Sequence, residues 1–174
     1  MAWRNAGVLC LQIKKGDPQM KPLLRFVSQF GAQIALNPEL VLEKNNRYYL
    51  LDSSVRKFAV GEFFYAGLYL GKVKNGLFFP SFNLLDMFAE VAANRVVLDR
   101  KAAWLFICGR DVFREGVVKV IGTKQSGEAV LVLNEFNECI GFGRLASGVV
   151  GSKGELAVKN VLDVGDFLRR ERGF

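Results

Sequence analysis

The chain has 174 residues, 51% of them hydrophobic, which predicts one large or two small folded domains and excludes a disordered chain. It contains no histidine, which excludes the Ser-His-Asp triad, the Cys-His pair and every imidazole metal ligand. The net charge is +7, and the basic excess is spread over both halves of the chain, so a polyanionic partner such as nucleic acid is expected. The alternative is a basic protein without such a partner.

The cysteines are far apart and include no CxxC pair, so we expect neither a structural zinc nor a disulfide framework. This cysteine usage suits a reducing compartment, and a cytoplasmic location is expected. No apolar run reaches the roughly 20 residues that a membrane-spanning helix needs, so no membrane partner is expected. Residues 1–19 match no element pattern and are interpreted as a peripheral extension. The three cysteines are Cys10, Cys108 and Cys139.

Residues 20–94 are predicted to form an N-terminal α/β domain, with an antiparallel sheet and flanking helices. Apolar residues at helical spacing follow Pro22 and predict a helix over 22–36. Two hairpins are predicted, turning at Asn45-Asn46 and at Asn75-Gly76, the strongest turn signal in the chain. The expected strands are 41–43, 48–51, 63–73 and 77–82, and the other expected helices are 53–59 and 84–93, the second capped by Asn83.

Aromatic residues are frequent around the second hairpin. A base-stacking platform is one use for such residues, but they fall on both faces of the predicted strands. Core packing is therefore the favoured interpretation. The residues concerned are Phe63, Phe64, Tyr65, Tyr69, Phe78, Phe79 and Phe82.

Residues 95–174 are predicted to form a small closed β-barrel with one helix at 102–107. Gly109 is expected to end this helix, because a C-terminal cap often needs a left-handed backbone. The junction at Asn94-Arg95 contains no Gly, Ser or Pro run, so the two domains are expected to be held rigidly. The barrel strands are expected at 96–98, 112–113, 117–121, 129–133, 139–145 and 157–162, followed by an amphipathic segment at 163–170.

The order of features in AAWLFICGRDVFREGV (102–117) resembles the signature of PUA domains, which are small RNA-binding β-barrels. A short helix and a glycine are followed there by Asp-Val and then by Gly-Val leading into a strand. With VLVLNEFNECIGFG (130–143) and VKNVLDVGDFLRR (158–170), the chain resembles the Nip-seven family of ribosome-assembly factors of archaea and eukaryotes, in its archaeal type.

In the N-terminal half, NNRYYLLD (45–52) and LLDMFAEVA (84–92) resemble the pre-PUA domain of the Nip-seven family. The resemblance covers about residues 22–170. It implies a pre-PUA domain at 20–94 and a PUA domain at 95–174. It further implies binding to pre-ribosomal RNA, a role in large-subunit maturation, and no catalysis.

The family resemblance also indicates where RNA contacts are expected. In archaeal members, basic residues just before and along the final strand contact RNA, and Lys159 matches one of those positions. Glu155 and Leu156 occupy the positions of the paired arginines, and Leu162 occupies a further basic position. Lys153 is the nearest basic residue, so this chain has a thinner basic set than the family.

Six basic residues are the candidate RNA contacts. Arg110 follows the glycine that ends the helix, where a PUA domain usually presents its RNA groove. Lys153 and Lys159 flank the end of the glycine-rich loop 147–154, whose backbone can approach phosphate closely. The C-terminal arginines either extend this patch or interact favourably with the dipole at the end of a helix. For each of the six residues, the alternative is a solvated surface charge without an RNA contact. The set is Arg110, Arg144, Lys153, Lys159, Arg169 and Arg170.

No catalytic residue, metal or cofactor is expected. SGVVGSKG (147–154) lacks the spacing of a Walker A loop, and no spacing brings two carboxylates into one cleft. The carboxylates concerned are Asp99, Asp111, Glu115, Asp163 and Asp166.

The sequence thus predicts a monomeric, non-catalytic RNA-binding protein of large-subunit ribosome biogenesis and pre-rRNA processing. Its PUA domain is expected to bind single-stranded or flexible RNA, because A-form duplex hides its base edges. Ribosome-assembly proteins are candidate partners. The alternatives are a PUA accessory subunit of a tRNA-modifying enzyme and a protein-interaction module without RNA affinity.

Overall fold

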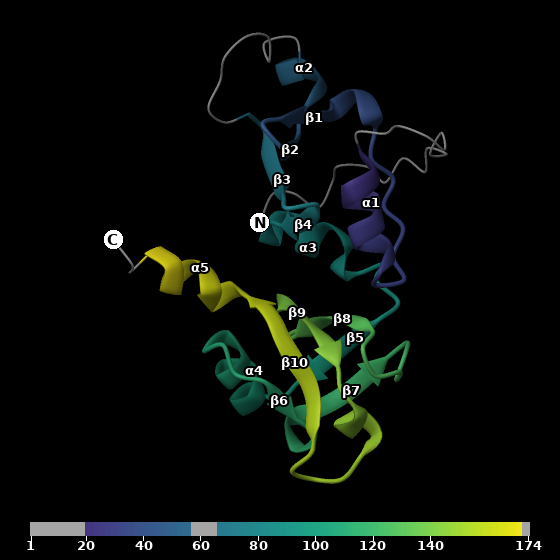
Figure 1. The fold of residues 1–174 in the computed structure, drawn as a ribbon, viewed down its shortest axis with the longest axis vertical. Coiled ribbons are helices and arrows are strands. Elements are labelled where there is room, and N and C mark those ends of the chain that lie inside the picture. The colour runs from purple at the N-terminus through teal and green to yellow at the C-terminus, as the bar shows by residue number, and fades with distance from the viewer. Residues whose placement is uncertain (1–19, 57–65, 172–174) are drawn as a thin grey trace.

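The computed structural model describes residues 20–56 and 66–171, arranged as two lobes stacked end to end (Figure 1). The predicted extension 1–19, the end of the helix expected at 53–59 and the beginning of the strand expected at 63–73 lie outside the described residues. None of the described helices is long and apolar enough to cross a membrane.

The N-terminal lobe is built on an antiparallel sheet of four strands in the order β1-β2-β3-β4. The predicted hairpin turns are confirmed, since Asn45, Asn46 and Asn75 adopt positive φ angles and each turn joins two paired strands. The strands are β1 (Val41–Lys44), β2 (Arg47–Leu50), β3 (Leu68–Lys74) and β4 (Leu77–Pro80). The helices are α1 (Lys21–Ser28), η2 (Pro38–Leu40), α2 (Ser53–Arg56) and α3 (Phe82–Ala89).

Two helix predictions in this lobe need correction. The helix expected over 22–36 ends at Ser28, because Gly31 turns the chain at φ +63° and residues 32–36 alternate between buried and exposed without helical structure. Helix α3 begins after Ser81 rather than Asn83. The Ser81 hydroxyl accepts a hydrogen bond from the Leu84 amide (3.2 Å) and donates one to the Tyr69 carbonyl (2.6 Å), which joins the cap to β3.

The C-terminal lobe contains a curled sheet of six strands in the order β6-β10-β9-β8-β5-β7. Its strand pairs are antiparallel except for β5 and β8, which run parallel. The strands are β5 (Arg95–Leu98), β6 (Val112–Phe113), β7 (Val117–Ile121), β8 (Ala129–Leu133), β9 (Cys139–Leu145) and β10 (Leu156–Asp163). The helices are α4 (Arg100–Ile107), η3 (Arg114–Gly116), η4 (Ser147–Val150) and α5 (Val164–Glu171).

The sheet does not close, so the prediction of a closed barrel is wrong. Strands β6 and β7 are its two edges and are joined through η3, but no ladder connects them among the described residues. The η3 turn instead forms backbone hydrogen bonds with other segments. The Arg114 amide donates to the Glu155 carbonyl (2.9 Å), and the Gly116 carbonyl accepts from the Asp99 amide (3.0 Å).

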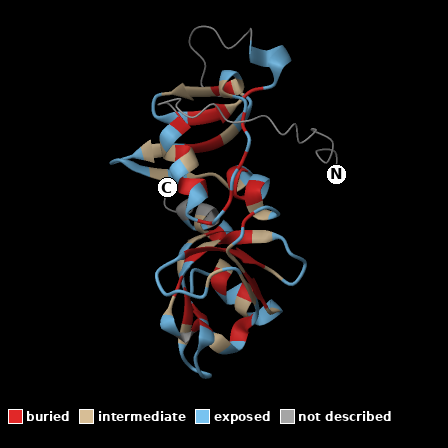
Figure 2. Ribbon diagram, turned by 90° about the vertical axis from the view of Figure 1, so that its right-hand side faces the viewer, coloured by how far each residue is buried: buried red, intermediate tan, exposed pale blue. Residues whose placement is uncertain are grey.

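Buried residues continue from one lobe into the other (Figure 2). Strand β8 is buried on both faces: Ala129 and Leu131 pack with the N-terminal core, whereas Val130 and Val132 pack inside the C-terminal sheet. Phe142 of β9 also faces the N-terminal core, where it meets aromatic rings of α1 and its C-terminal turn. The apolar run of β8 is therefore shared by both lobes.

Asn94 joins the lobes through hydrogen bonds to both. Its amide donates to the Phe30 carbonyl (3.0 Å), its own carbonyl accepts from the Leu131 amide (3.0 Å), and its side-chain oxygen accepts from the Thr123 amide (3.1 Å). The connection between the lobes is thus bonded on both sides rather than suspended as a free linker.

Replacing Asp86 of α3 with asparagine is expected to raise the melting temperature at neutral pH by about 1–2 °C. Partial burial raises the pKa of Asp86, and the Glu138 carboxylate raises it further, so its ionisation weakens the folded state. The contribution of Asp86 to the free energy of unfolding is present below the ordinary carboxyl pKa. It is lost as the pH rises through the raised pKa of Asp86. Thermal unfolding across the acidic range measures this loss, which Asp86→Asn should remove. A Glu90→Gln control that stabilises equally would contradict this explanation.

Candidate nucleic-acid interface

Two predicted contact residues, Arg144 and Lys159, lie directly opposite each other in the β9–β10 ladder. Side chains in such a pair share one face of the sheet, about 5 Å apart at their Cβ atoms, and like charges placed this way repel. Both residues are exposed. The Arg144 guanidinium donates to the Gly127 carbonyl (2.8 Å), which holds its stem along the sheet. The pair therefore presents two positive charges to solvent at one position of the ladder.

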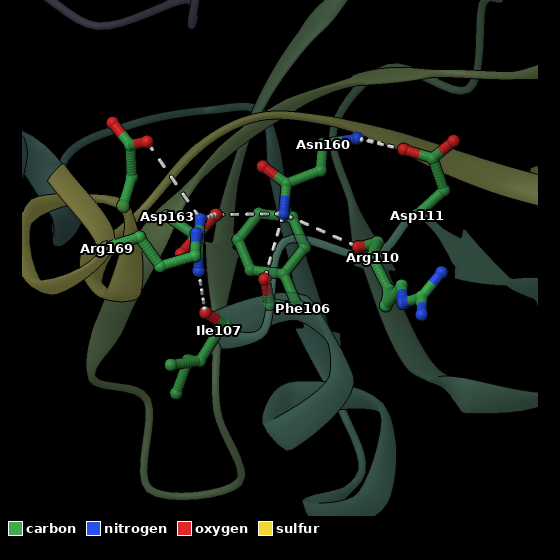
Figure 3. A network of polar contacts seen from close by, with 8 residues as sticks. Phe106, Ile107, Arg110, Asp111, Asn160, Asp163 and Arg169 are labelled. Carbon is green, nitrogen blue, oxygen red and sulfur yellow. Dashed lines mark hydrogen bonds and ion pairs between the residues drawn. The ribbon is translucent and has the colours of Figure 1, made fainter. Parts of the chain in front are cut away.

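The loop that carries Arg110 approaches the same stretch of β10 from its other edge. The β6 ladder ends at the Val158–Val112 pair, and beyond it the Asn160 amide donates to the Asp111 carboxylate (2.8 Å). The Asn160 side chain donates to the Arg110 carbonyl (3.4 Å). The Arg110 side chain is exposed and points away from these bonds (Figure 3).

A network of polar contacts joins the end of α4 to β10 and α5 (Figure 3). The Asn160 side-chain nitrogen donates to the Phe106 carbonyl (2.9 Å), and Arg169 Nη1 donates to the Ile107 carbonyl (2.6 Å). Both acceptors belong to the last turn of α4, where the helix dipole favours positive charge. The Phe106 carbonyl also accepts a hydrogen bond from the Gly109 amide (2.9 Å). Arg169 thus caps a different helix from the one that carries it.

Asp163 holds the Arg169 guanidinium in this network. Asp163 Oδ2 lies 2.7 Å from Arg169 Nη2 and 3.3 Å from Asn160 Nδ2. The carboxylate is buried, whereas the Arg169 side chain is 43% exposed. The hydrogen bond to Asp163 is the main reason why the pKa of Arg169 is raised. The Asp163 Oδ1 atom is buried and has no hydrogen-bond partner among the described residues.

Gly109 ends α4 as predicted, with φ +85°. A Cβ at this position would lie 3.2 Å from Arg169 Nη2, so the glycine also leaves room for the guanidinium. The turn that presents Arg110 is therefore shaped both by backbone conformation and by the approach of α5.

Lys153 lies apart from the other candidates, in the loop that enters β10 at the end away from α5 (Figure 1). Its neighbour Gly154 donates its amide to the Glu115 carboxylate (3.0 Å). This hydrogen bond is the main cause that lowers the pKa of Glu115, and the charge of Lys153 also contributes. The positive charge of Lys153 therefore interacts in part with the Glu115 carboxylate.

The structure thus places Arg110, Arg144 and Lys159 around the middle of β10. It sets Lys153 near the beginning of that strand and engages Arg169 in the α4 cap. Arg170 belongs to α5, but its side chain lies outside the described part of the chain. The sequence analysis did not identify Asn160, which bonds β10 to the end of α4 and to the loop that carries Arg110. The only signal for this role was a polar residue within an apolar strand.

Residues 94–172, which include the C-terminal lobe, match the family model described as the UPF0113 PUA domain. No curated protein matches the chain. A conserved PUA domain protein from Thermoplasma acidophilum shares the fold, with 20% identity and a TM-score of 0.60 over 88% of this chain and 93% of that chain.

Two other archaeal structures are similar to parts of the chain. A PUA domain from Aeropyrum pernix K1, solved as a tartrate complex, is 25% identical, with a TM-score of 0.46 over 54% of this chain and 56% of that chain. This chain therefore spans little more than half of that protein. A hypothetical protein from Pyrococcus horikoshii OT3 is 20% identical, with a TM-score of 0.49 over 75% and 77% of the two chains.

Proposed function

We propose that this chain is a non-catalytic RNA-binding protein of large-subunit ribosome biogenesis and pre-rRNA processing. It binds single-stranded or flexible RNA through the PUA domain, on the surface around Arg110, Arg144 and Lys159. The PUA match supports the RNA-binding part of this proposal, and the resemblance of 22–170 to the Nip-seven family supports the ribosomal part.

The like-charged pair in the β9–β10 ladder is the observation that carries the proposed binding site. Arg144 and Lys159 are paired across two neighbouring strands, where opposite charges would stabilise the sheet and like charges weaken it. A phosphate placed between the two cations would remove this repulsion and form charge-assisted hydrogen bonds. The arrangement therefore favours an anionic ligand over a purely structural use of the two residues.

The carboxylates considered as catalytic candidates have structural partners in the C-terminal lobe, which supports a non-catalytic role. Asp99 caps α4 by accepting from the Ala102 amide (2.7 Å). Asp111 accepts from the Asn160 amide, and Glu115 accepts from the Gly154 amide. Asp163 holds Arg169, and Asp166 lies 4.0 Å from the same guanidinium.

Fluorescence anisotropy with a labelled single-stranded RNA tests the binding site. The Arg110→Gln/Lys159→Gln variant should bind more weakly, and its plot of log affinity against log salt should be shallower by about 1.4, which corresponds to two lost phosphate contacts. Lys119→Gln/Lys124→Gln removes two exposed charges elsewhere in the same lobe and should retain the native slope. Equal loss in both variants would contradict a localised site.

The ribosomal role needs a separate measurement in cells. Crosslinking followed by sequencing of the bound RNA is expected to recover precursor ribosomal RNA. Recovery of tRNA instead would contradict this role and favour an accessory subunit of a tRNA-modifying enzyme. Absence of RNA binding even at low salt would contradict the whole proposal and favour a protein-interaction module.

A further inference from the structure

A groove of about 940 Å³ lies between the two lobes, beside the edge strand β4. Lys21 and Arg25 of α1 and Lys72 of β3 line it from the N-terminal lobe, and Arg144 of β9 lines it from the C-terminal lobe. Its size lies near the upper end of the roughly 300–1,000 Å³ that proteins use for small ligands. Since Arg144 also belongs to the proposed RNA surface, the groove is continuous with that surface.

The charges that line the groove favour an anionic occupant. Lys21, Arg25, Lys72 and Arg144 are all exposed basic residues. Asp166 is the acidic residue among the lining side chains, and it lies 4.0 Å from Arg169 Nη2, so its charge is partly balanced by an arginine. Four cations facing one groove from both lobes raise the local concentration of a polyanion.

The groove also carries an exposed aromatic ring beside a cation. Phe79 of β4 is 41% exposed and lies directly opposite Lys72 in the β3–β4 ladder, so both side chains occupy the same face of the sheet. Phe78, next to it in sequence, turns the other way and packs against Phe26 in the core. The Phe78 ring therefore packs in the core, whereas the Phe79 ring faces solvent at the groove.

Basic side chains that follow a backbone, combined with accessible aromatic rings, are the features by which proteins bind single strands without sequence preference. A second protein partner would need a larger apolar area and fewer like charges than this groove offers. We propose that the groove binds a segment of single-stranded RNA that continues from Arg144 on the PUA surface. Lys21 and Lys72 contact its phosphates, and Phe79 stacks on a base. This inference rests on the proposed function, because it extends the path of the same RNA.

Oligouridylates of roughly 4 and roughly 12 nucleotides test the groove, because only the longer strand can reach beyond the PUA surface. The Lys21→Ala/Lys72→Ala variant should bind the longer RNA with a salt slope shallower by about 1.4, and the shorter RNA with the native slope. Phe79→Ala should weaken binding of the longer RNA by at least about fivefold. Lys119→Ala/Lys124→Ala is the charge-matched control, and thermal unfolding of each variant confirms that it is folded.

The outcomes separate this inference from the proposed function. If Arg110→Gln/Lys159→Gln weakens binding and the groove variants bind both RNAs as the native protein does, the groove inference fails and the PUA surface stands. If the native protein binds neither RNA at low salt, both fail. If sedimentation shows a native dimer that Lys21→Ala/Lys72→Ala dissociates, the groove holds a second copy of the chain and the inference is overturned.

Discussion

Replacement of Phe30 with alanine is expected to lower the free energy of unfolding by about 3–5 kcal/mol. Phe30 is 0% exposed and lies at the meeting point of the lobes. Its ring centroid lies 5.2 Å from that of Phe26, 5.3 Å from that of Phe88 and 5.6 Å from that of Phe142 on the C-terminal sheet. The variant therefore loses buried apolar area and leaves a cavity that both lobes line.

Urea unfolding followed by circular dichroism measures this loss. Phe136→Ala provides the matched control, because it removes the same side chain from a position that is 72% exposed in the turn before β9. That control should change stability by no more than about 0.5 kcal/mol. A loss below about 1 kcal/mol for Phe30→Ala would show that the aromatic contacts between the lobes contribute little to folding.

Replacement of Gly141 with alanine is expected to cost about 3 kcal/mol or more. Gly141 lies in β9 at φ +148°, a conformation that residues with a Cβ rarely adopt. A Cβ there would clash with the Leu162 carbonyl and approach the Cα of Asp163 at 2.9 Å. The substitution forces β9 and β10 apart at the Gly141–Asp163 pair, three residues along β9 from Arg144, so RNA binding should weaken together with stability.

Gly127→Ala separates the backbone strain of Gly141→Ala from its steric clash. Gly127 also has a positive φ, +90°, but no atom lies within 4 Å of a Cβ placed on it. This control should lose only the conformational part, about 1 kcal/mol, in chemical denaturation. Equal losses in the two variants would show that the contact with β10 is unimportant.

Local chemistry made most of the elements predictable. The Asn-Asn and Asn-Gly dipeptides specified two hairpins, because these residues tolerate the left-handed backbone that tight turns require. Gly109 marked the end of α4 for the same reason. The strands predicted at 117–121, 129–133 and 139–145 have those same bounds in the structure, because β-branched and apolar runs between turn residues signal strands directly.

The errors arose where one pattern fits two structures. Phe30 and Ile34 are four residues apart, which suits a helix, yet Ala32, Ile34 and Leu36 are the buried members of an alternating segment. Closure of the barrel also had no local signal, because it depends on whether the two-residue strand β6 reaches β7 across the seam. Strand spacing gives the number of strands but not the pairing of the edges.

The candidate site was less accessible to sequence reasoning because its partners are distant in the chain. The bond from Arg169 to the Ile107 carbonyl spans 62 positions, and the bond from Asn160 to the Phe106 carbonyl spans 54. Charge alone made Arg169 a candidate for RNA contact, while its bonds to α4 and Asp163 emerge only from the fold. The groove residues Lys21 and Lys72 were missed because they come from separate elements of the other lobe.

The double-sided burial of β8 also limits how the protein can be dissected. Cutting the chain before Arg95 would leave Ala129, Leu131 and Phe142 on an uncovered apolar face of the C-terminal fragment. Such a face promotes self-association, and a fragment of this kind is prone to aggregate. Soluble truncations would need polar replacements on that face, so the C-terminal lobe of this chain is not a freely transferable module.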